Sequence, residues 1–341
     1  MFDHRLHGEP AVSPVKGGRH THLPLGPQAE KNRADSFFVI VNPAAGKRPE
    51  AQRAHKICAL LRAAGKRAEL SLTAGPGDAC RLAREAVQAG AGVVVGAGGD
   101  GTLQEIGRAL EATDVALGNI PAGCCNDFAR AVGLLRSDSP ERLAAVLIQG
   151  LQRAVDLGGV GAHRFLTVAT FGFSSVANRF VQGRKRRSRG TLAYLLAVLW
   201  MLRSYRAPPA ILRGDFGERS GRFLLAAIGN TPFCGGHLPL TPQADFRDGL
   251  FQVCLVGDVS RLAVLSALGR LFRGTHLAHS AVETFDTHFL EIETSLEQGW
   301  ICADGESLCQ TPCRLEVRPQ ALRVVVDFPS GEIDTASMVT P

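Results

Sequence analysis

Three short segments of this sequence carry the residue types that phosphate chemistry needs. They are Gly98-Gly99-Asp100-Gly101-Thr102, Gly123-Cys124-Cys125-Asn126-Asp127 and Asp304-Gly305-Glu306. Glycine lets backbone amides approach a phosphate, and a helix that begins at such a turn presents the positive end of its dipole. A carboxylate repels a bare phosphate, so Asp100 predicts a Mg²⁺ ion or an acceptor hydroxyl between the two.

Each segment taken alone also has a structural interpretation. Asp100 fits a capped strand-to-helix turn, Asn126-Asp127 fits a capped helix, and Asp304-Gly305 fits the tip of a surface hairpin. The glycine pattern is neither a Walker phosphate loop nor a Rossmann fingerprint. The combination of segments, rather than any one of them, favours a catalytic role.

The first two segments lie where strands and helices alternate. Short apolar runs predict strands, and capped amphipathic stretches predict helices between them. The expected strands are 37–41, 68–72, 93–95 and 115–120, and the expected helices are 49–64, 78–88, about 102–112 and one after residue 127. This order predicts a parallel, doubly wound α/β sheet. Because ligands bind at the carboxyl ends of parallel strands, we expect the turns 42–47, 98–102 and 121–127 at one edge.

The second half of the chain is richer in strands, which predicts an antiparallel β-domain. The strand-like runs are 153–157, 164–173, 209–213, 222–229, 250–256, 281–293, 299–303, 313–318 and 322–328, with helices at about 174–183, 191–204 and 260–272. Residues 1–35 are rich in Pro, Gly and His without apolar periodicity, which predicts a disordered tail. We therefore divide the rest into an α/β domain (36–152), a β-rich domain (153–330) and a C-terminal tail (331–341).

Taken together, the motifs resemble those of the diacylglycerol kinase catalytic family, which includes sphingosine and ceramide kinases and bacterial lipid kinases. The signatures follow in the family's order: Val41-Asn42-Pro43 with Gly46-Lys47, then Gly98 to Thr102, then Ile120-Pro121 with Gly123 and Asn126-Asp127-Phe128-Ala129-Arg130, and finally Asp304-Gly305-Glu306. The resemblance covers about residues 36–328. It implies an N-terminal α/β ATP-binding domain, a C-terminal β-sandwich for the lipid substrate, and an active site in the cleft between them.

The resemblance also implies how ATP and Mg²⁺ are held. The loop from Asn42 through Gly46 to Lys47 corresponds to part of the nucleotide-phosphate loop. Asp100 corresponds to the ligand of Mg²⁺-ATP. The residues that correspond to further nucleotide contacts are Gly98, Gly99, Gly101, Thr102, Gly123, Cys124, Asn126 and Asp127, and Asp127 is also a candidate metal ligand.

On the lipid side, the resemblance implies that Glu306 is the general base for the lipid hydroxyl, with Asp304 in its turn. Asp156 matches a family carboxylate linked through water and metal with the Lys47 region, and Asp248 matches a structural-metal turn of bacterial relatives. The implied chemistry needs these residue types. An alcohol is too weak an acid to attack unaided, and a carboxylate base removes its proton as the attack proceeds.

One position departs from the family pattern. Cys124 stands where the family usually has Thr, and a thiol donates hydrogen bonds more weakly than a hydroxyl. A lost hydrogen bond to a charged phosphate costs about 1–3 kcal/mol, which predicts slower turnover or weaker ATP affinity. A thiol at a helix N-terminus is also a candidate for oxidation.

Charge and hydropathy predict a membrane-facing surface on a cytoplasmic protein. All of the excess positive charge lies between Leu157 and Gly214, where ten Lys or Arg residues stand without any Asp or Glu. This segment includes the basic run 184–189 and the apolar run 191–203, so we expect an anionic membrane to bind the former and acyl chains to contact the latter. The alternative is a solvated loop beside a core helix. No run reaches the ~18 apolar residues of a membrane span.

Composition sets the remaining expectations. The nine cysteines and the absence of an apolar signal segment favour reduced thiols and a cytoplasmic location, peripheral at the inner membrane face. The confined basic charge argues against nucleic-acid binding. A homodimer is an option in the family. The leading function is an ATP-dependent lipid kinase acting on a diacylglycerol-like, phosphatidylglycerol-like or sphingoid lipid; the alternatives are a nucleotide- or lipid-binding pseudokinase and an NAD kinase.

Overall fold

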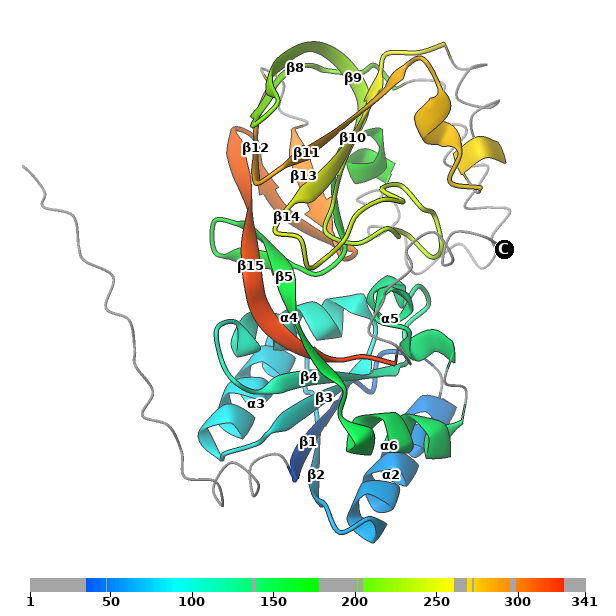
Figure 1. Ribbon diagram of the computed structural model, residues 1–341, viewed down its shortest axis with the longest axis vertical. Helices are drawn as coiled ribbons and strands as arrows, with labels where there is room; N and C mark the ends of the chain where they lie inside the picture. The colour runs from blue at the N-terminus through cyan, green and yellow to red at the C-terminus, as the bar shows by residue number, and fades with distance from the viewer. Residues whose placement is uncertain are drawn as a thin grey trace, which may run out of the picture.

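The computed structural model describes residues 35–46, 48–136, 139–177, 201, 205–260, 269–271, 273–294 and 299–327. Figure 1 shows an α/β domain below a β-rich domain. The α/β domain contains β1 (Ser36–Val41), α2 (Arg48–Ala63), β2 (Arg67–Leu72), α3 (Asp78–Gln88), β3 (Val93–Gly98), α4 (Asp100–Leu110), β4 (Ala116–Pro121), α5 (Asp127–Ala131), the 3-10 turn η1 (Leu134–Arg136) and α6 (Pro140–Gln149).

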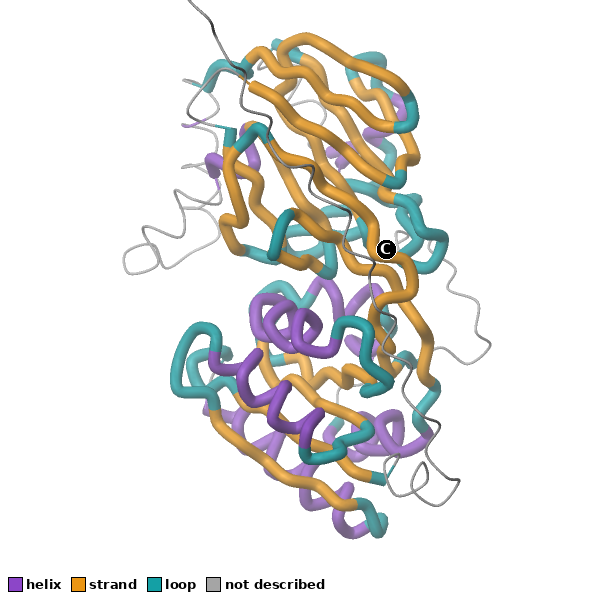
Figure 2. The backbone as a smooth tube through the Cα atoms, turned by 90° about the vertical axis from the view of Figure 1, so that its left-hand side faces the viewer, coloured by secondary structure: helices purple, strands orange, loops and turns teal. Residues whose placement is uncertain are grey.

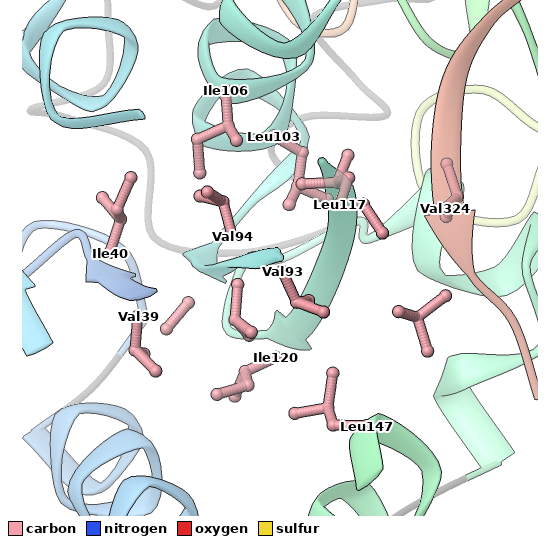
Figure 3. Close-up of a cluster of buried hydrophobic side chains, with 14 of the residues drawn as sticks. Val39, Ile40, Val93, Val94, Leu103, Ile106, Leu117, Ile120, Leu147 and Val324 are labelled. Carbon is pink, nitrogen blue, oxygen red and sulfur yellow. The ribbon is translucent and has the colours of Figure 1, made fainter. Parts of the chain in front are cut away.

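The strands of the α/β domain form a parallel sheet in the order β2-β1-β3-β4, as predicted. Alternation along each strand sends apolar side chains to both faces of this sheet. In Figure 3, Val94 and Leu117 point toward α4, whereas Val93 and Ile120 point toward α6. These side chains are almost completely buried, and burial of one such chain contributes about 1.5–3 kcal/mol. This core fixes the strand ends at which the three turns lie.

The β-rich domain begins with β5 and contains antiparallel strands. They are β5 (Gln152–Val160), β6 (His163–Phe165), β7 (Val168–Gly172), β8 (Pro209–Gly214), β9 (Gly217–Gly229), β10 (Phe251–Gly257), β11 (Val282–Thr287), β12 (Phe289–Thr294), β13 (Trp300–Ala303), β14 (Glu306–Gln310) and β15 (Cys313–Val325), with the 3-10 turn η2 (His276–Ala278). Figure 2 shows strands dominating this domain, whereas helices line the other. The predicted fold class, an α/β domain followed by a β-sandwich, is confirmed.

Two long strands join the domains. β15 pairs with β12 at one end and, at the other, lies parallel to β4, with Arg323 opposite Ala116. β5 runs antiparallel to β15 along most of this ribbon, which is visible between the domains in Figure 1. The end of β15 therefore belongs to the core of the α/β domain, where Leu322 and Val324 are buried. A shared ribbon limits how freely one domain moves relative to the other.

Several element boundaries differ from the sequence expectation. The runs 313–318 and 322–328 form the single strand β15, with a register shift between Arg318 and Leu322. The run 281–293 is split into β11 and β12. β14 was not predicted, because its five residues, Glu-Ser-Leu-Cys-Gln, are too few and too polar to stand out. Helix 174–183 is described only to residue 177, and most of 191–204 and 260–272 lies outside the described residues, as do both tails.

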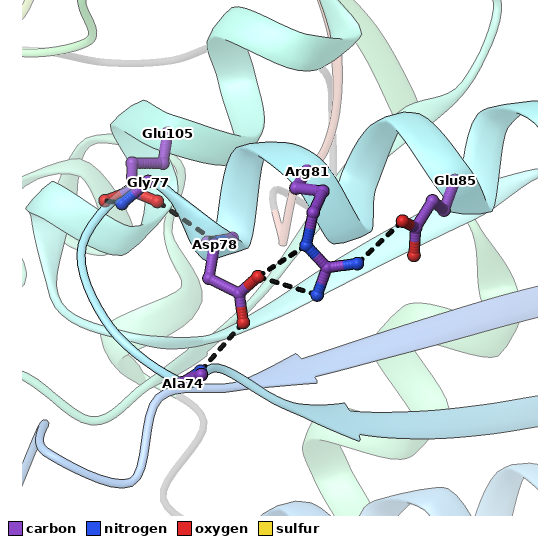
Figure 4. Close-up of polar contacts among 7 residues, drawn as sticks. Ala74, Gly77, Asp78, Arg81, Glu85 and Glu105 are labelled. Atoms are coloured by element: carbon purple, nitrogen blue, oxygen red, sulfur yellow. Dashed lines mark hydrogen bonds and ion pairs between the residues drawn. The ribbon is translucent and has the colours of Figure 1, made fainter.

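Helices α3 and α4 are held together at the N-terminus of α3. Glu105 of α4 accepts hydrogen bonds from the amides of Gly77 and Ala79, at 2.9 and 3.1 Å. Asp78 accepts one from Ala74 at 2.7 Å and pairs with Arg81 (Figure 4). The first amides of a helix have no partners within it, so a carboxylate here satisfies them and favours the helix dipole. The contact fixes α4, the helix that carries Asp100.

Candidate active site

The turns after β3 and β4 pack backbone against backbone. The Ala122 amide donates to the Gly98 carbonyl at 3.0 Å, and Gly123 lies directly beside Gly99. A methyl group built on Gly123 would lie only 2.6 Å from the Cα of Gly99, so no larger residue fits there without moving the backbone. Glycine is therefore needed for this close approach, which brings the predicted nucleotide turns to one edge of the sheet.

Asp100 is the first residue of α4 and faces the start of α5. Its Oδ2 accepts the amide of Asp127 at 3.2 Å, and its Oδ1 accepts the amide of Phe128 at 3.1 Å. Burial raises the pKa of Asp100, and the nearby Asp127 carboxylate adds to this rise. A partly buried carboxylate whose charge is disfavoured gains from a cation, so Asp100 is suited to hold one.

Two asparagines shape the predicted nucleotide side. Asn42 donates to Thr102 Oγ1 at 2.9 Å, which joins the turn after β1 to the first turn of α4. Asn126 has a left-handed backbone, with φ of 53°, and both accepts from the amide and donates to the carbonyl of Gly123 at 2.8 Å. Asn126 thus closes the turn that exposes Cys124. Gly46 is exposed beside this edge, and Lys47 lies outside the described residues.

Glu306 approaches the same edge from the β-rich domain. It is the first residue of β14 and is exposed. A methyl group built on Gly101 would lie 3.8 Å from Glu306 Oε1, so this carboxylate faces the N-terminal turn of α4. Glu306 and Asp100 therefore come from different domains, and both lie at the N-terminal turn of α4.

Asp304 is buried beneath the turn that presents Glu306. Its carboxylate accepts from the amides of Leu166 and Thr167, at 2.7 and 3.0 Å, and from the Thr167 hydroxyl at 2.5 Å. Burial raises the pKa of Asp304 to about 7, against the lowering effect of these hydrogen bonds. Asp304 thus fixes the turn from within, and its contacts are with protein groups.

Asp127 is a link between the domains. It is 4% exposed, and its carboxylate accepts the amide of Gly236 at 3.1 Å and that of His237 at 3.2 Å. Gly235, Gly236 and His237 all have positive φ, which turns successive amides toward one anion. Arg130, one helical turn on, lies over the ring of Phe233 at 5.5 Å. The start of α5 is therefore attached to the loop between β9 and β10.

Asp156 and Asp248 lie apart from this edge. Asp156 is 1% exposed and accepts the amides of Gln320 and Gly249 at 2.7 and 2.8 Å, while Asp248 caps the amide of Leu250 at 2.9 Å. Burial raises the pKa of both carboxyls, and Asp245 adds to each rise. Asp156 therefore links the loop before β10 to β15, whereas Asp248 stabilises that loop locally.

The donor set at Asp100 fits Mg²⁺. Mg²⁺ takes oxygen ligands and is usually held by one or two carboxylates together with phosphates. Each carboxylate has about four acceptor positions, and the amides of Asp127 and Phe128 use two of those on Asp100. Asp127 has fewer left, because it holds Gly236 and His237. Within the described ranges, no group of three or more His, Cys, Asp or Glu side chains is arranged to hold a metal ion by itself.

Sequence reasoning missed the residues that position this site. Thr167, Gly236 and His237 contact predicted site residues but carry no motif of their own. The adjacent glycines Gly235 and Gly236 were the one available signal, since such a pair marks a turn with positive φ. The sequence around this turn does not indicate that its amides bind the carboxylate of Asp127.

Comparisons with known proteins cover both domains of this fold. Two sequence models divide the chain between them: "Diacylglycerol kinase catalytic domain" matches residues 36–160, and "YegS C-terminal NAD kinase beta sandwich-like domain" matches residues 167–326. A diacylglycerol kinase of Mycobacterium tuberculosis is 31% identical over 304 residues, which cover 87% of this chain and 97% of the relative. A Pseudomonas aeruginosa protein named "Probable lipid kinase YegS-like" is 33% identical over 299 residues, which cover 87% of this chain and 95% of the relative.

The chain belongs to the diacylglycerol kinase family, whose members are phosphotransferases that act on an alcohol group. The fold agrees with this. The crystal structure of a diacylglycerol kinase from Bacillus anthracis superposes with a TM-score of 0.70 at 23% identity, and the match covers 86% of this chain and 97% of the other. In the described part of the chain, no helix is long and apolar enough to span a membrane.

Proposed function

We propose that this protein transfers the γ-phosphate of Mg²⁺-ATP to the hydroxyl group of a lipid. The observation that carries the proposal is the meeting of Asp100 and Glu306 at the N-terminus of α4, from opposite domains. Asp100 is half-buried beside amides at the predicted phosphate edge, and Glu306 is exposed, where an acceptor hydroxyl would reach it. Phosphoryl transfer needs one group that helps to neutralise the charge of the phosphates and another that removes the proton of the acceptor hydroxyl.

The roles follow from the surroundings of each residue. Asp100 would hold Mg²⁺, which when bound neutralises charge on the transferred phosphoryl group. The amides of the two glycine turns and the N-terminus of α4 favour the same negative charge. Glu306, held by the turn that Asp304 fixes, would accept the proton of the hydroxyl. Asn42, through Thr102, would keep the turn after β1 in register with these groups.

For the acceptor we propose a lipid with a free hydroxyl, of the diacylglycerol, phosphatidylglycerol or sphingoid type. The relatives that cover most of this chain are named diacylglycerol kinase or lipid kinase. We also propose that the protein acts at an anionic membrane surface through the basic run 184–189, which lies outside the described residues. Sedimentation with anionic vesicles, with Arg184, Lys185, Arg186 and Arg187 changed to Ser, tests this contact; undiminished binding contradicts it.

The decisive experiment incubates the protein with γ-labelled ATP, Mg²⁺ and a panel of lipids in mixed micelles. We expect label in one lipid class and a loss of roughly 10²–10⁴-fold in Glu306→Gln, as for removal of a general base. Glu283→Gln is the matched control, because Glu283 is an exposed glutamate of the same domain that pairs with Arg219. Bound ATP without transfer to any lipid supports a pseudokinase instead. A parallel incubation with NAD in place of the lipids tests the NAD kinase alternative, which label in NAD would support.

A further inference from the structure

Three cysteines gather where the two domains meet. Cys124 and Cys125 lie in the turn between β4 and α5, and Cys234 lies in the loop that holds Asp127. A methyl group built on Gly236 would lie 3.5 Å from Cys125 Sγ, so this thiol faces the loop of the other domain. Burial raises the pKa of the Cys234 thiol, and the nearby Asp127 carboxylate adds to this rise.

Within this group, Cys124 and Cys125 form a contact pair. Their sulfur atoms are 3.8 Å apart, Cys124 is exposed and Cys125 is half-buried. A disulfide needs a sulfur–sulfur separation of about 2.05 Å, and its Cα atoms are usually about 4.4–6.8 Å apart. Consecutive Cα atoms are only about 3.8 Å apart, so closing this gap requires side-chain rotation together with distortion of the turn backbone. The Cys124 thiol is therefore accessible to a reagent, and the Cys125 thiol lies in contact with the Cys124 sulfur.

The surroundings assign the order of reaction. Cys124 is exposed, whereas Cys125 is half-buried and faces Gly236 of the other domain, so an oxidant in solution reaches Cys124 first. The contact between the two sulfur atoms gives Cys125 a high effective concentration as the second reactant.

We propose that Cys124 and Cys125 form an oxidative modification site at which a hydroperoxide produces a reversible disulfide between the two neighbouring residues. The Cys124 thiolate attacks the peroxide, which forms a sulfenic acid and releases an alcohol or water. The Cys125 thiolate then attacks the Cys124 sulfur, the S–OH bond breaks, and the hydroxide leaves as water with one proton. The peroxide takes up the two electrons that the two thiols lose.

The disulfide changes the turn that Asn126 closes. It forms a small ring through the Cys124–Cys125 peptide bond, and the hydrogen bonds of Asn126 to Gly123 depend on the geometry of that peptide. The Asp127 amide, which donates to Asp100, follows directly. We expect oxidation to weaken nucleotide binding about tenfold, the value of one hydrogen bond to a charged group. This effect rests on the proposed ATP site, whereas the thiol chemistry does not.

The first test follows the thiols alone. The full-length protein is treated with hydrogen peroxide, the remaining thiols are alkylated, and the peptide that holds Cys124 and Cys125 is analysed by mass spectrometry. We expect this peptide to lose two hydrogens and to recover them with dithiothreitol. Sulfinic or sulfonic acid at Cys124 without a disulfide, or an unmodified pair, overturns the proposal.

Variants separate the two sulfurs. In Cys125→Ser, Cys124 has no thiol partner in contact, so oxidation should proceed to acids that dithiothreitol does not reverse. Cys80→Ser is the matched control, because Cys80 is a buried thiol of α3 in the same domain, and it should behave as the unchanged protein does. Reversible oxidation in Cys125→Ser contradicts the proposed pairing.

The second test measures the affinity for a fluorescent ATP analogue before and after peroxide, with each variant compared with its own untreated form. A tenfold weakening that dithiothreitol restores supports regulation of the nucleotide turn. A disulfide that leaves affinity unchanged overturns the regulatory step. If the reduced protein binds no ATP analogue, the proposed function fails, and the mass measurement still decides the thiol chemistry.

Discussion

The Asp127 carboxylate and the Gly236 amide connect the two domains, with distances of 3.2 and 3.1 Å from the amide nitrogen to the two oxygens. The residue lies in the Asn126-to-Arg130 motif that the family resemblance associates with nucleotide. In this structure its carboxylate accepts hydrogen bonds from the amides of Gly236 and His237. Asp127 lies at the end of the predicted nucleotide turn and also holds the β9–β10 loop of the β-rich domain against that turn.

We expect Asp127→Asn to loosen this link, because a charge-assisted hydrogen bond is worth about 1.5–3 kcal/mol and an amide has one acceptor oxygen rather than two. Hydrogen exchange at Gly236 and His237 should become faster. Asp78→Asn is the control, since Asp78 accepts an amide within the α/β domain alone, from Ala74. Unchanged exchange at Gly236 in Asp127→Asn would show that the link is not what orders the loop.

Glu105 should contribute to stability rather than to chemistry. Glu105→Ala leaves the amides of Gly77 and Ala79 without their partner, and we expect the free energy of unfolding to fall by about 1–3 kcal/mol. Urea unfolding measures this. Glu85→Ala, which removes an exposed pair with Arg81, should cost about 0–1 kcal/mol. Equal losses in the two variants would contradict the role given to Glu105.

The buried carboxyl of Asp304 predicts a pH dependence of stability. Its pKa in the folded protein is about 7, above the ordinary value of 3.8 that it regains on unfolding. Between these values the folded state retains a proton that the unfolded state has lost. Asp304 therefore stabilises the fold least at high pH, and its contribution declines by roughly 1.4 kcal/mol for each unit as pH rises through this window.

Urea unfolding at about pH 5 and about pH 8 tests this dependence, with Asp304→Asn as the comparison, because asparagine is nearly isosteric and does not titrate. The free energy of unfolding should decline more with rising pH in the unchanged protein than in the variant. An equal decline in the unchanged protein and in Asp304→Asn would show that a group other than Asp304 causes the pH dependence.

Sequence patterns predicted the parallel sheet well, because β1, β3 and β4 are apolar runs between capped helices. They also predicted that the turns after β1, β3 and β4 lie at one edge of the sheet, because each of these turns directly follows a parallel strand. They did not predict β14, whose short polar sequence has no period, nor the continuity of β15, since Pro319 interrupts its apolar pattern. The hydrogen bond between Asp127 and Gly236 was not predicted for a different reason. It joins residues 109 positions apart, and only the packing of two domains brings them together.

Cys124 is the position where a substitution should improve the protein. It is exposed in the turn that Asn126 closes, at the predicted phosphate edge. A threonine hydroxyl donates a stronger hydrogen bond than a thiol, and one regained bond to phosphate is worth about 1–3 kcal/mol. We therefore expect Cys124→Thr to bind an ATP analogue about 5- to 160-fold more tightly. Cys124→Ala, which donates no hydrogen bond, should gain nothing. An equal gain in both variants would show that relief of thiol bulk, rather than a hydroxyl contact, limits binding at this turn.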